Sequence, residues 1–161
     1  MLTKVEIRPQ VGSPVEINTL VYPLQEYDPE LDLPTTSLKK MGQSGHWPTF
    51  SYPGTMTVIL AGEIYGSGAT NALIAEDTMA KRRALQDACL PPLDQTLTTR
   101  RHGTLRVRYD DMDEDADSDF HCVVCKIGLV AGQPGKAAYL INLHCFDPYF
   151  VGVTSSDIYI A

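Results

Sequence analysis

The stretch that decides the fold runs from Thr55 to Leu90 and reads TMTVILAGEIYGSGATNALIAEDTMAKRRALQDACL. Its first part, residues 55–65, is rich in β-branched side chains and nearly free of charge, which is typical of a buried strand. The glycines of Gly66-Ser67-Gly68 then interrupt that strand, and a helical pattern follows. We therefore expect a strand that passes directly into a helix lying against a sheet.

The helix expected over Asn71–Leu90 is amphipathic. One face carries the side chains that we expect to pack on the sheet: Ile74, Thr78, Leu85, Ala88 and Cys89, widened by Ala75 and Met79. The other face carries Glu76, Ala80, Arg83 and Asp87. Asp77 and Lys81 are spaced for an i,i+4 ion pair, and Pro91-Pro92 ends the helix because proline disfavours a helical conformation in the residue before it.

Strand patterns occupy much of the remaining chain. Apolar and polar residues alternate near Val5 and Ile7 and again near Val15 and Ile17, and Leu20, Tyr22 and Leu24 extend the second of these strands. Further strands are expected at residues 104–109, 120–130, 137–146 and 151–160. The turn-forming residues 131–136 make a hairpin of the second and third. The chain is therefore predicted to be β-rich (α+β) and, at 161 residues, a single domain over residues 1–161.

Residues 25–53 lack a regular period and are expected to form one long loop. Seven of the eleven prolines precede residue 54, and four of them lie in this segment: Pro29, Pro34, Pro48 and Pro53. Loops of this length are rare in compact domains and are usually functional or disordered. The aromatic side chains of Trp47, Phe50 and Tyr52 make the segment a candidate interface with neighbouring subunits.

Residues 110–119 form a dense acidic run. Its carboxylates belong to Asp110, Asp111, Asp113, Glu114, Asp115, Asp117 and Asp119. They account for the whole formal net charge of −7, because acidic and basic residues balance in the rest of the chain. Three interpretations stay open: a solvated hairpin loop, a charged surface that lines a channel, and a calcium-type site. The EF-hand pattern fails, because Ser118 replaces glycine at the sixth position counted from Asp113 and Val124 replaces glutamate at the twelfth.

Cys122-Val-Val-Cys125 is a single CxxC motif, with His121, His144 and Cys145 in the same predicted hairpin. Two thiolates and two imidazoles are a donor set suited to zinc. In a regular strand, however, positions 122 and 125 point to opposite faces. The favoured interpretation is therefore that these are buried strand cysteines, and the alternative is a small metal-binding protein or an enzyme.

Several classes of function are disfavoured. The net negative charge argues against a nucleic-acid-binding surface. No run of 18 apolar residues and no apolar leader segment is present, so we expect no membrane association. The sequence lacks GxSxG, HExxH and phosphate-binding loops, and its four histidines are scattered. We therefore expect neither an enzyme nor a cofactor. The clusters Lys81-Arg82-Arg83 and Arg100-Arg101-His102 are interpreted as surface charges or as a contact for an acidic partner.

The order of these features resembles the distal tail protein (Dit-like) family of long-tailed bacteriophages over about residues 15–155. A glycine-containing loop, Lys40-Met-Gly-Gln-Ser-Gly45, leads into a hydrophobic strand that ends near Gly62-Glu-Ile. A helix rich in Lys, Arg and Leu follows and ends at Leu90-Pro91-Pro92. The last long strand runs into Asp147-Pro148-Tyr149-Phe150, the most characteristic part of the resemblance.

The resemblance implies a β-sandwich or split barrel of the tail-tube type with one flanking helix, assembled as a homohexameric ring. Such a ring belongs to the virion, its subunits are synthesised in the bacterial host cytoplasm, and it joins the tail-tube protein to the hub protein at the tail tip. DNA and the tape-measure protein pass through its channel without specific binding. Because the same fold serves tail-tube and tail-terminator proteins, those roles are the alternatives. Many family members carry a second, sugar-binding-like domain, and its activity is not implied here.

Overall fold

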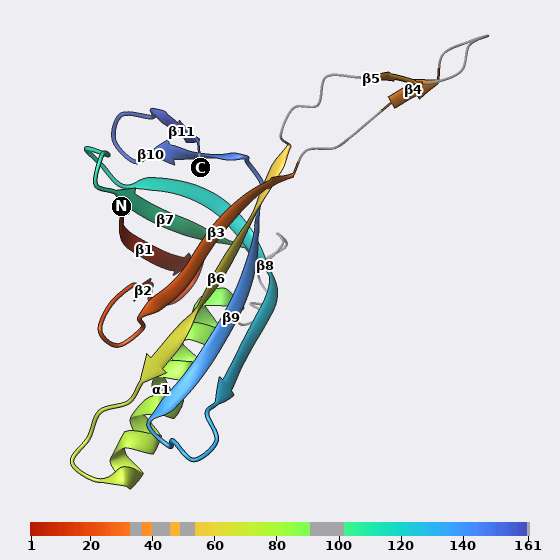
Figure 1. Cartoon of the computed structure of the whole chain (residues 1–161). Helices are drawn as coiled ribbons and strands as arrows, with labels where there is room; N and C mark the ends of the chain where they lie inside the picture. The colour runs from red at the N-terminus through yellow and green to blue at the C-terminus, as the bar shows by residue number, and fades with distance from the viewer. Residues whose placement is uncertain (33–36, 40–45, 49–53, 91–101, 161) are drawn as a thin grey trace.

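The computed structural model describes residues 1–32, 37–39, 46–48, 54–90 and 102–160. The elements of its N-terminal half are β1 (Leu2–Pro9), β2 (Val15–Ile17), β3 (Leu24–Asp32), β4 (Ser37–Lys39), β5 (His46–Pro48), β6 (Thr55–Tyr65) and α1 (Asn71–Cys89). Those that follow are β7 (Gly103–Tyr109), β8 (Ala116–Leu129), β9 (Lys136–Cys145), β10 (Tyr149–Gly152) and β11 (Ile158–Ile160). Figure 1 shows their arrangement.

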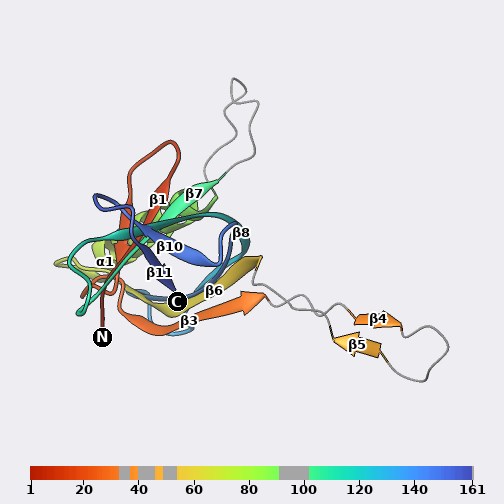
Figure 2. The same ribbon diagram turned by 90° about the horizontal axis from the view of Figure 1, so that it is seen from above.

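Nine of these strands form one antiparallel sheet, in the order β2-β1-β7-β8-β9-β6-β3, with β10 paired to both β8 and β11. The sheet curls into a half-barrel, and α1 packs on its inner face (Figure 2). The curl brings β3 back toward β7: the Tyr109 hydroxyl donates a hydrogen bond to the Tyr27 hydroxyl at 3.1 Å, although three strands separate them in the sheet. The predicted β-rich fold of the split-barrel type, with one flanking helix, is confirmed.

The core lies between the inner face of the sheet and α1. In β6, alternate side chains are buried, and Met56, Val58, Leu60 and Ile64 are fully enclosed. Its neighbour β9 contributes Ala137, Tyr139, Ile141, Leu143 and Cys145 in the same alternation. Burial of each large apolar side chain contributes about 1.5–3 kcal/mol. The strand predicted at residues 55–65 is thereby confirmed with its bounds.

The helix also forms where it was predicted, and its buried residues are Thr78, Leu85, Ala88 and Cys89. The Thr70 side chain caps its N-terminus by accepting a hydrogen bond from the Leu73 N–H at 3.3 Å. Lys81 forms the expected ion pair with Asp77 at 2.5 Å. The prediction was wrong for Met79, which is 46% exposed, because only a narrow stripe of the helix reaches the sheet. Among the described residues, no helix has the length and apolarity needed to cross a membrane.

The prediction of one loop over residues 25–53 was wrong for its first part, which forms β3. Alternation is present there: Tyr27, Pro29 and Leu31 are half-buried, while the acidic residues between them are exposed. β3 is an edge strand of the sheet, and an edge strand tolerates proline because one of its sides lacks a partner strand. The expected extension of the strand beyond Ile17 was also wrong, because Asn18 turns the chain with a φ of 67°.

Further along this segment, β4 and β5 pair with each other as a separate two-stranded sheet, with Leu38 opposite Trp47. Trp47 therefore lies in a hairpin strand rather than a loop. Phe50 and Tyr52, the other candidate interface residues, lie outside the described residues.

At the C-terminal side, the prediction of one strand over residues 151–160 was wrong, because the chain forms the β10–β11 hairpin instead. The reversal lies between Val153 and Asp157, where Ser156 adopts a φ of 60°. A left-handed residue of this kind ends a strand, and the alternating apolar pattern does not reveal it.

Candidate assembly surface

The outer face of the half-barrel, opposite α1, is not covered by any described element. It is formed by β3, β6, β9 and β8, whose side chains alternate between the core and this face. Its middle carries small or neutral side chains: Thr57, Ile59, Ala61, Ala138, Leu140 and Asn142. An uncovered sheet face of this size is a candidate contact surface or channel wall.

An acidic row runs along β3 at one margin of this face. Glu26, Asp28, Glu30 and Asp32 are all exposed, and register pairing places them beside Ala61, Ile59, Thr57 and Thr55 of β6. The Thr55 hydroxyl donates a hydrogen bond to Asp32 at 2.7 Å. Sequence reasoning missed this row because the segment was interpreted as a loop. Its signal is the alternation of acidic with Tyr, Pro and Leu residues.

Two histidines lie on the same face, one on β8 and one on β9. His121 on β8 and His144 on β9 are cross-strand neighbours, with ring centroids 5.0 Å apart. Phe146 stacks on His121 at 5.5 Å, and His144 Nδ1 lies 3.9 Å from the Asp32 carboxylate. Across the described residues, no group of three or more His, Cys, Asp or Glu side chains is arranged to hold a metal ion.

Two strand edges border this face. β3 has only β6 as a neighbour in the described sheet. β8 pairs with β7 only over residues 116–120, so its continuation beyond Phe120 has β9 on one side and no described strand on the other. Val123 on this part of β8 is 61% exposed. Open backbone edges of this kind pair readily with a strand from another molecule.

Three carboxylates of the acidic run at residues 110–119 have cationic partners. Asp115 accepts a hydrogen bond from Lys4 at 2.8 Å, and this contact raises the pKa of the lysine. Arg106 binds Asp117 through two nitrogens at 2.7 and 2.8 Å, which raises the pKa of the guanidinium. Asp110 lies 3.2 Å from the terminal amine of Met1. The interpretation as a solvated loop is therefore wrong for Asp115 and Asp117, whereas Asp110 is exposed in a turn.

The other acidic residues of the run differ in their contacts. Asp119 accepts a hydrogen bond from the Thr104 hydroxyl at 2.9 Å, while Asp111 and Asp113 are exposed. Glu114 accepts hydrogen bonds from the backbone N–H groups and hydroxyls of Thr154 and Ser155 in the β10–β11 turn. These donors, led by the Ser155 hydroxyl, lower the pKa of Glu114 to about 2. Part of the run thus holds the C-terminal hairpin to the sheet.

The CxxC cysteines lie on the same side of β8, contrary to the prediction of opposite faces. A β-bulge between Cys122 and Val124 adds one residue to the strand. Cys122 therefore pairs with Leu143 and Cys125 with Ile141, both of which face the core. Both cysteines are half-buried rather than buried, and they meet Cys89 at the end of α1.

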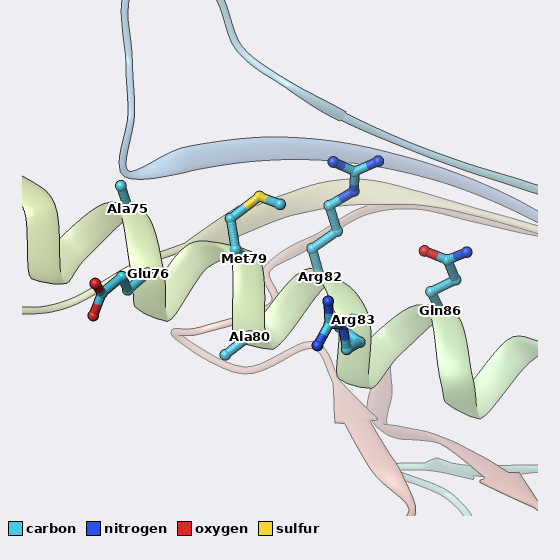
Figure 3. A pocket seen from close by; sticks show the side chains of 7 residues that line it. All are labelled: Ala75, Glu76, Met79, Ala80, Arg82, Arg83 and Gln86. Carbon is cyan, nitrogen blue, oxygen red and sulfur yellow. The ribbon is translucent and has the colours of Figure 1, made fainter.

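A shallow groove of about 600 Å³ follows the exposed side of α1 (Figure 3). Its lining residues are Ala75, Glu76, Met79, Ala80, Arg82, Arg83 and Gln86. Lys81, the third member of the basic cluster, points elsewhere, because its ammonium binds Asp77 and the Tyr65 carbonyl at 3.0 Å. The groove thus combines two guanidinium groups with an exposed methionine.

Comparison with known proteins relates this fold to a phage tail component. The chain is similar to the crystal structure of SPP1 Dit (gp 19.1), described as a paradigm of the hub adsorption apparatus in phages that infect Gram-positive bacteria. The fold is that of a distal tail protein. The TM-score is 0.53 at 15% sequence identity, and the match covers 94% of this chain.

The chain spans about half of the SPP1 protein, of which 52% is covered. No protein-family model matches the sequence. No curated protein matches it either. The resemblance that the sequence suggested is therefore confirmed at the level of the fold.

Proposed function

We propose that the chain is a structural subunit of a phage tail, a distal tail protein that forms a ring between the tail tube and the hub. The observation that carries the proposal is the similarity to SPP1 Dit over 94% of the chain. The open strand edges and the uncovered sheet face support it, because a ring subunit needs surfaces for two neighbours and a wall for its channel. No catalytic step is part of this role.

The two open edges suit a ring with head-to-tail contacts. β8, β9, β6 and β3 are successive antiparallel neighbours, so β3 and β8 run in opposite directions. If β3 of one copy lies beside β8 of the next, the antiparallel alternation continues from copy to copy. A heterologous contact of this kind closes into a ring when the rotation between copies fits. We propose six copies, as the resemblance implies.

Charge on the two edges is complementary. β3 presents its acidic row, whereas β8 presents Lys126 and His121 on the same face of the sheet. A row of like charges and a proline on an edge strand discourage unspecific pairing with strands of other molecules. A neighbour that offers a lysine and a histidine can nevertheless accept the acidic edge. The β4–β5 hairpin with Trp47 is a second proposed contact between neighbours.

The uncovered face is the proposed channel wall. Acidic side chains on such a wall repel DNA phosphates within a Debye length of about 8 Å at physiological salt. DNA and the tape-measure protein would pass without being bound. The β3 row serves this purpose better than residues 110–119, because ion pairs neutralise much of that run. Within that run, the exposed carboxylates of Asp111 and Asp113 still contribute a negative electrostatic field.

Assembly of the purified chain tests the ring. We expect closed rings of uniform size by mass photometry and negative-stain electron microscopy. Lys126→Glu on the β8 edge should convert rings to monomers, because it places a carboxylate beside the acidic row of the neighbouring copy. Arg83→Glu on α1 is the matched control with the same change of charge, and it should assemble normally. Rings that are unaffected by Lys126→Glu would refute the β3–β8 contact, and a wild-type monomer at high concentration would count against the ring itself.

The test also separates the alternatives within the tail. A tail-tube subunit stacks its rings into long tubes, whereas a distal tail protein gives single or paired rings. Tubes in the micrographs would therefore favour the tail-tube role.

A further inference from the structure

Three thiols meet where the end of α1 lies against the bulged part of β8. Cys89 is the last residue of the helix and is 3% exposed, while Cys122 and Cys125 are half-buried in the strand. The three side chains lie close enough together to shift one another's pKa values. The Cys122 thiol also lies 3.3 Å from the Val124 carbonyl oxygen, to which it donates. The proposed tail function uses none of these groups.

The bulge brings the two strand cysteines within reach of each other. In a regular strand, residues three apart are separated by about 10 Å between Cα atoms and point to opposite faces. Here their β9 partners, Leu143 and Ile141, are only two residues apart. The separation of Cys122 and Cys125 along the sheet is thus about 6.5 Å between Cα atoms, near the upper limit of about 6.8 Å that is usual for a disulfide.

The thiols of the cluster shift one another's pKa values in opposite directions. Hydrogen bonds from Cys122 and Cys89 lower the pKa of Cys125 well below that of an ordinary thiol, because they stabilise its thiolate. The same interactions raise the pKa of Cys122 and Cys89, which remain protonated. Cys145 offers a contrast within the chain, since burial raises its pKa to about 11. Cys125 is half-buried, whereas Cys89 is enclosed in the core.

We propose that Cys125 and Cys122 form a thiol–disulfide exchange site for low-molecular-weight disulfides, with Cys125 as the attacking sulfur and Cys122 as the resolving one. The Cys125 thiolate attacks one sulfur of the small disulfide, forms a mixed disulfide and releases the first thiolate. Cys122 then loses its proton and attacks the Cys125 sulfur, which releases the second thiolate and leaves the Cys122–Cys125 disulfide. Two protein thiols are oxidised and one small disulfide is reduced to two thiols.

Each thiol of the cluster has a distinct part in this exchange. Cys89 is a positioning residue, because it donates a hydrogen bond to the thiolate from within the core and would have to leave the core to react. Cys122 is the resolving residue because it lies on the same face of β8 as Cys125 and, unlike Cys89, is only half-buried. The proposal concerns the chain's own chemistry and does not depend on its role in a tail.

The experiment treats the full chain with 4,4′-dithiodipyridine and follows the release of thiopyridone. For the wild type we expect two equivalents of thiopyridone, no retained pyridyl adduct, and a loss of two hydrogen atoms in the intact mass. Peptide mapping should locate the disulfide between Cys122 and Cys125. The rate should change less than about threefold from pH 7 to pH 5, whereas an ordinary thiol slows about 100-fold because its thiolate fraction falls tenfold per pH unit.

Three variants test which cysteine attacks the small disulfide and which one resolves the mixed disulfide. Cys122→Ser should release one equivalent of thiopyridone and keep the adduct on Cys125. Cys125→Ser should lose the fast, pH-independent phase. Cys145→Ser is the matched control and should behave as the wild type. Equal rates in Cys125→Ser and the wild type, or a disulfide that maps to Cys89, would overturn the proposal.

A second measurement avoids variants that fail to fold. Wild-type chain is treated at pH 6 with less than one equivalent of iodoacetamide, and the alkylated peptide is identified. Alkylation confined to Cys125 is expected, and an even distribution over the four cysteines would contradict the assignment.

Discussion

At the scale of single residues, close contact between the backbone and α1 restricts which side chain one position can carry, and composition does not reveal this restriction. Gly66 lies at the end of β6 beside α1, where a Cβ would overlap the Thr78 hydroxyl and the Ile74 carbonyl oxygen. Both belong to the second and third turns of the helix, and Thr78 is buried. The glycine thus sets how closely the connection can approach α1.

Gly66→Ala should lower the free energy of unfolding by about 1–3 kcal/mol, because the backbone or the helix must shift to admit the methyl group. Urea denaturation measures this loss. Gly128→Ala is the control, since a Cβ there has no neighbour within 4 Å. Equal midpoints for the two variants would show that the helix adjusts without cost.

Glu114 provides a pH-dependent contact between residues 110–119 and the C-terminal hairpin. Its pKa is about 2 in the folded chain against a usual value of 4.5, so the folded state favours the carboxylate. Stability from this shift is present above pH 4.5 and is lost as the pH falls toward 2. Glu114→Gln should therefore have a lower urea midpoint than the wild type at pH 6, and the difference should shrink toward pH 2.5. Glu30→Gln, on exposed β3, should show no such convergence.

At the scale of elements, α1 is held by a narrower stripe than its sequence suggests. Leu85 is fully buried, whereas Met79 is largely exposed on the side that carries the groove (Figure 3). The inner face of a strongly curled sheet contacts one stripe of a helix, so the flanking row remains outside.

Leu85→Ala should cost about 2–5 kcal/mol, because it removes buried methyl groups and leaves a cavity. Met79→Ala should change the free energy of unfolding by less than about 0.5 kcal/mol, as expected at an exposed site. Thermal and urea unfolding of the two variants measure the difference. A large loss of unfolding free energy in Met79→Ala alone would mean that the helix packs on the sheet through the face that carries Met79.

At the scale of the whole molecule, the two acidic regions have different environments. The β3 row lies on the uncovered face and is exposed, whereas most of residues 110–119 contact cations or the C-terminal hairpin. In a ring, only charges that remain unpaired contribute a field in the channel.

The triple variant Glu26→Gln, Asp28→Asn and Glu30→Gln should therefore assemble into particles that release DNA more slowly, because phosphates adhere to the neutral wall. Added salt should relieve the defect through screening. The control is Asp111→Asn with Asp113→Asn, which we expect to release DNA normally. A defect in the control alone would move the channel wall to the acidic run. Failed assembly of the triple variant would show that the proposed β3–β8 contact requires the charges of the β3 row.

The sequence by itself determined the elements whose pattern is local. The strand at residues 55–65 and the helix that follows it have an unbroken period, and clear turn residues mark the hairpin of β8 and β9, so short-range preferences suffice to predict that these elements exist. The resemblance to distal tail proteins rested on the order of these same elements.

Only the tertiary structure decided where the edges, the bulge and the partners lie. β3 tolerates its proline because it is an edge strand, which depends on the order of strands in the sheet. The bulge at Cys122 follows from pairing with β9 and reverses the face on which Cys125 lies. Lys4 of β1 pairs with Asp115, and Arg106 of β7 pairs with Asp117 on the neighbouring β8, so the charge of the acidic run depends on contacts between residues distant in the sequence. Local preferences carry no information about such pairings, because they form only when the sheet closes around α1.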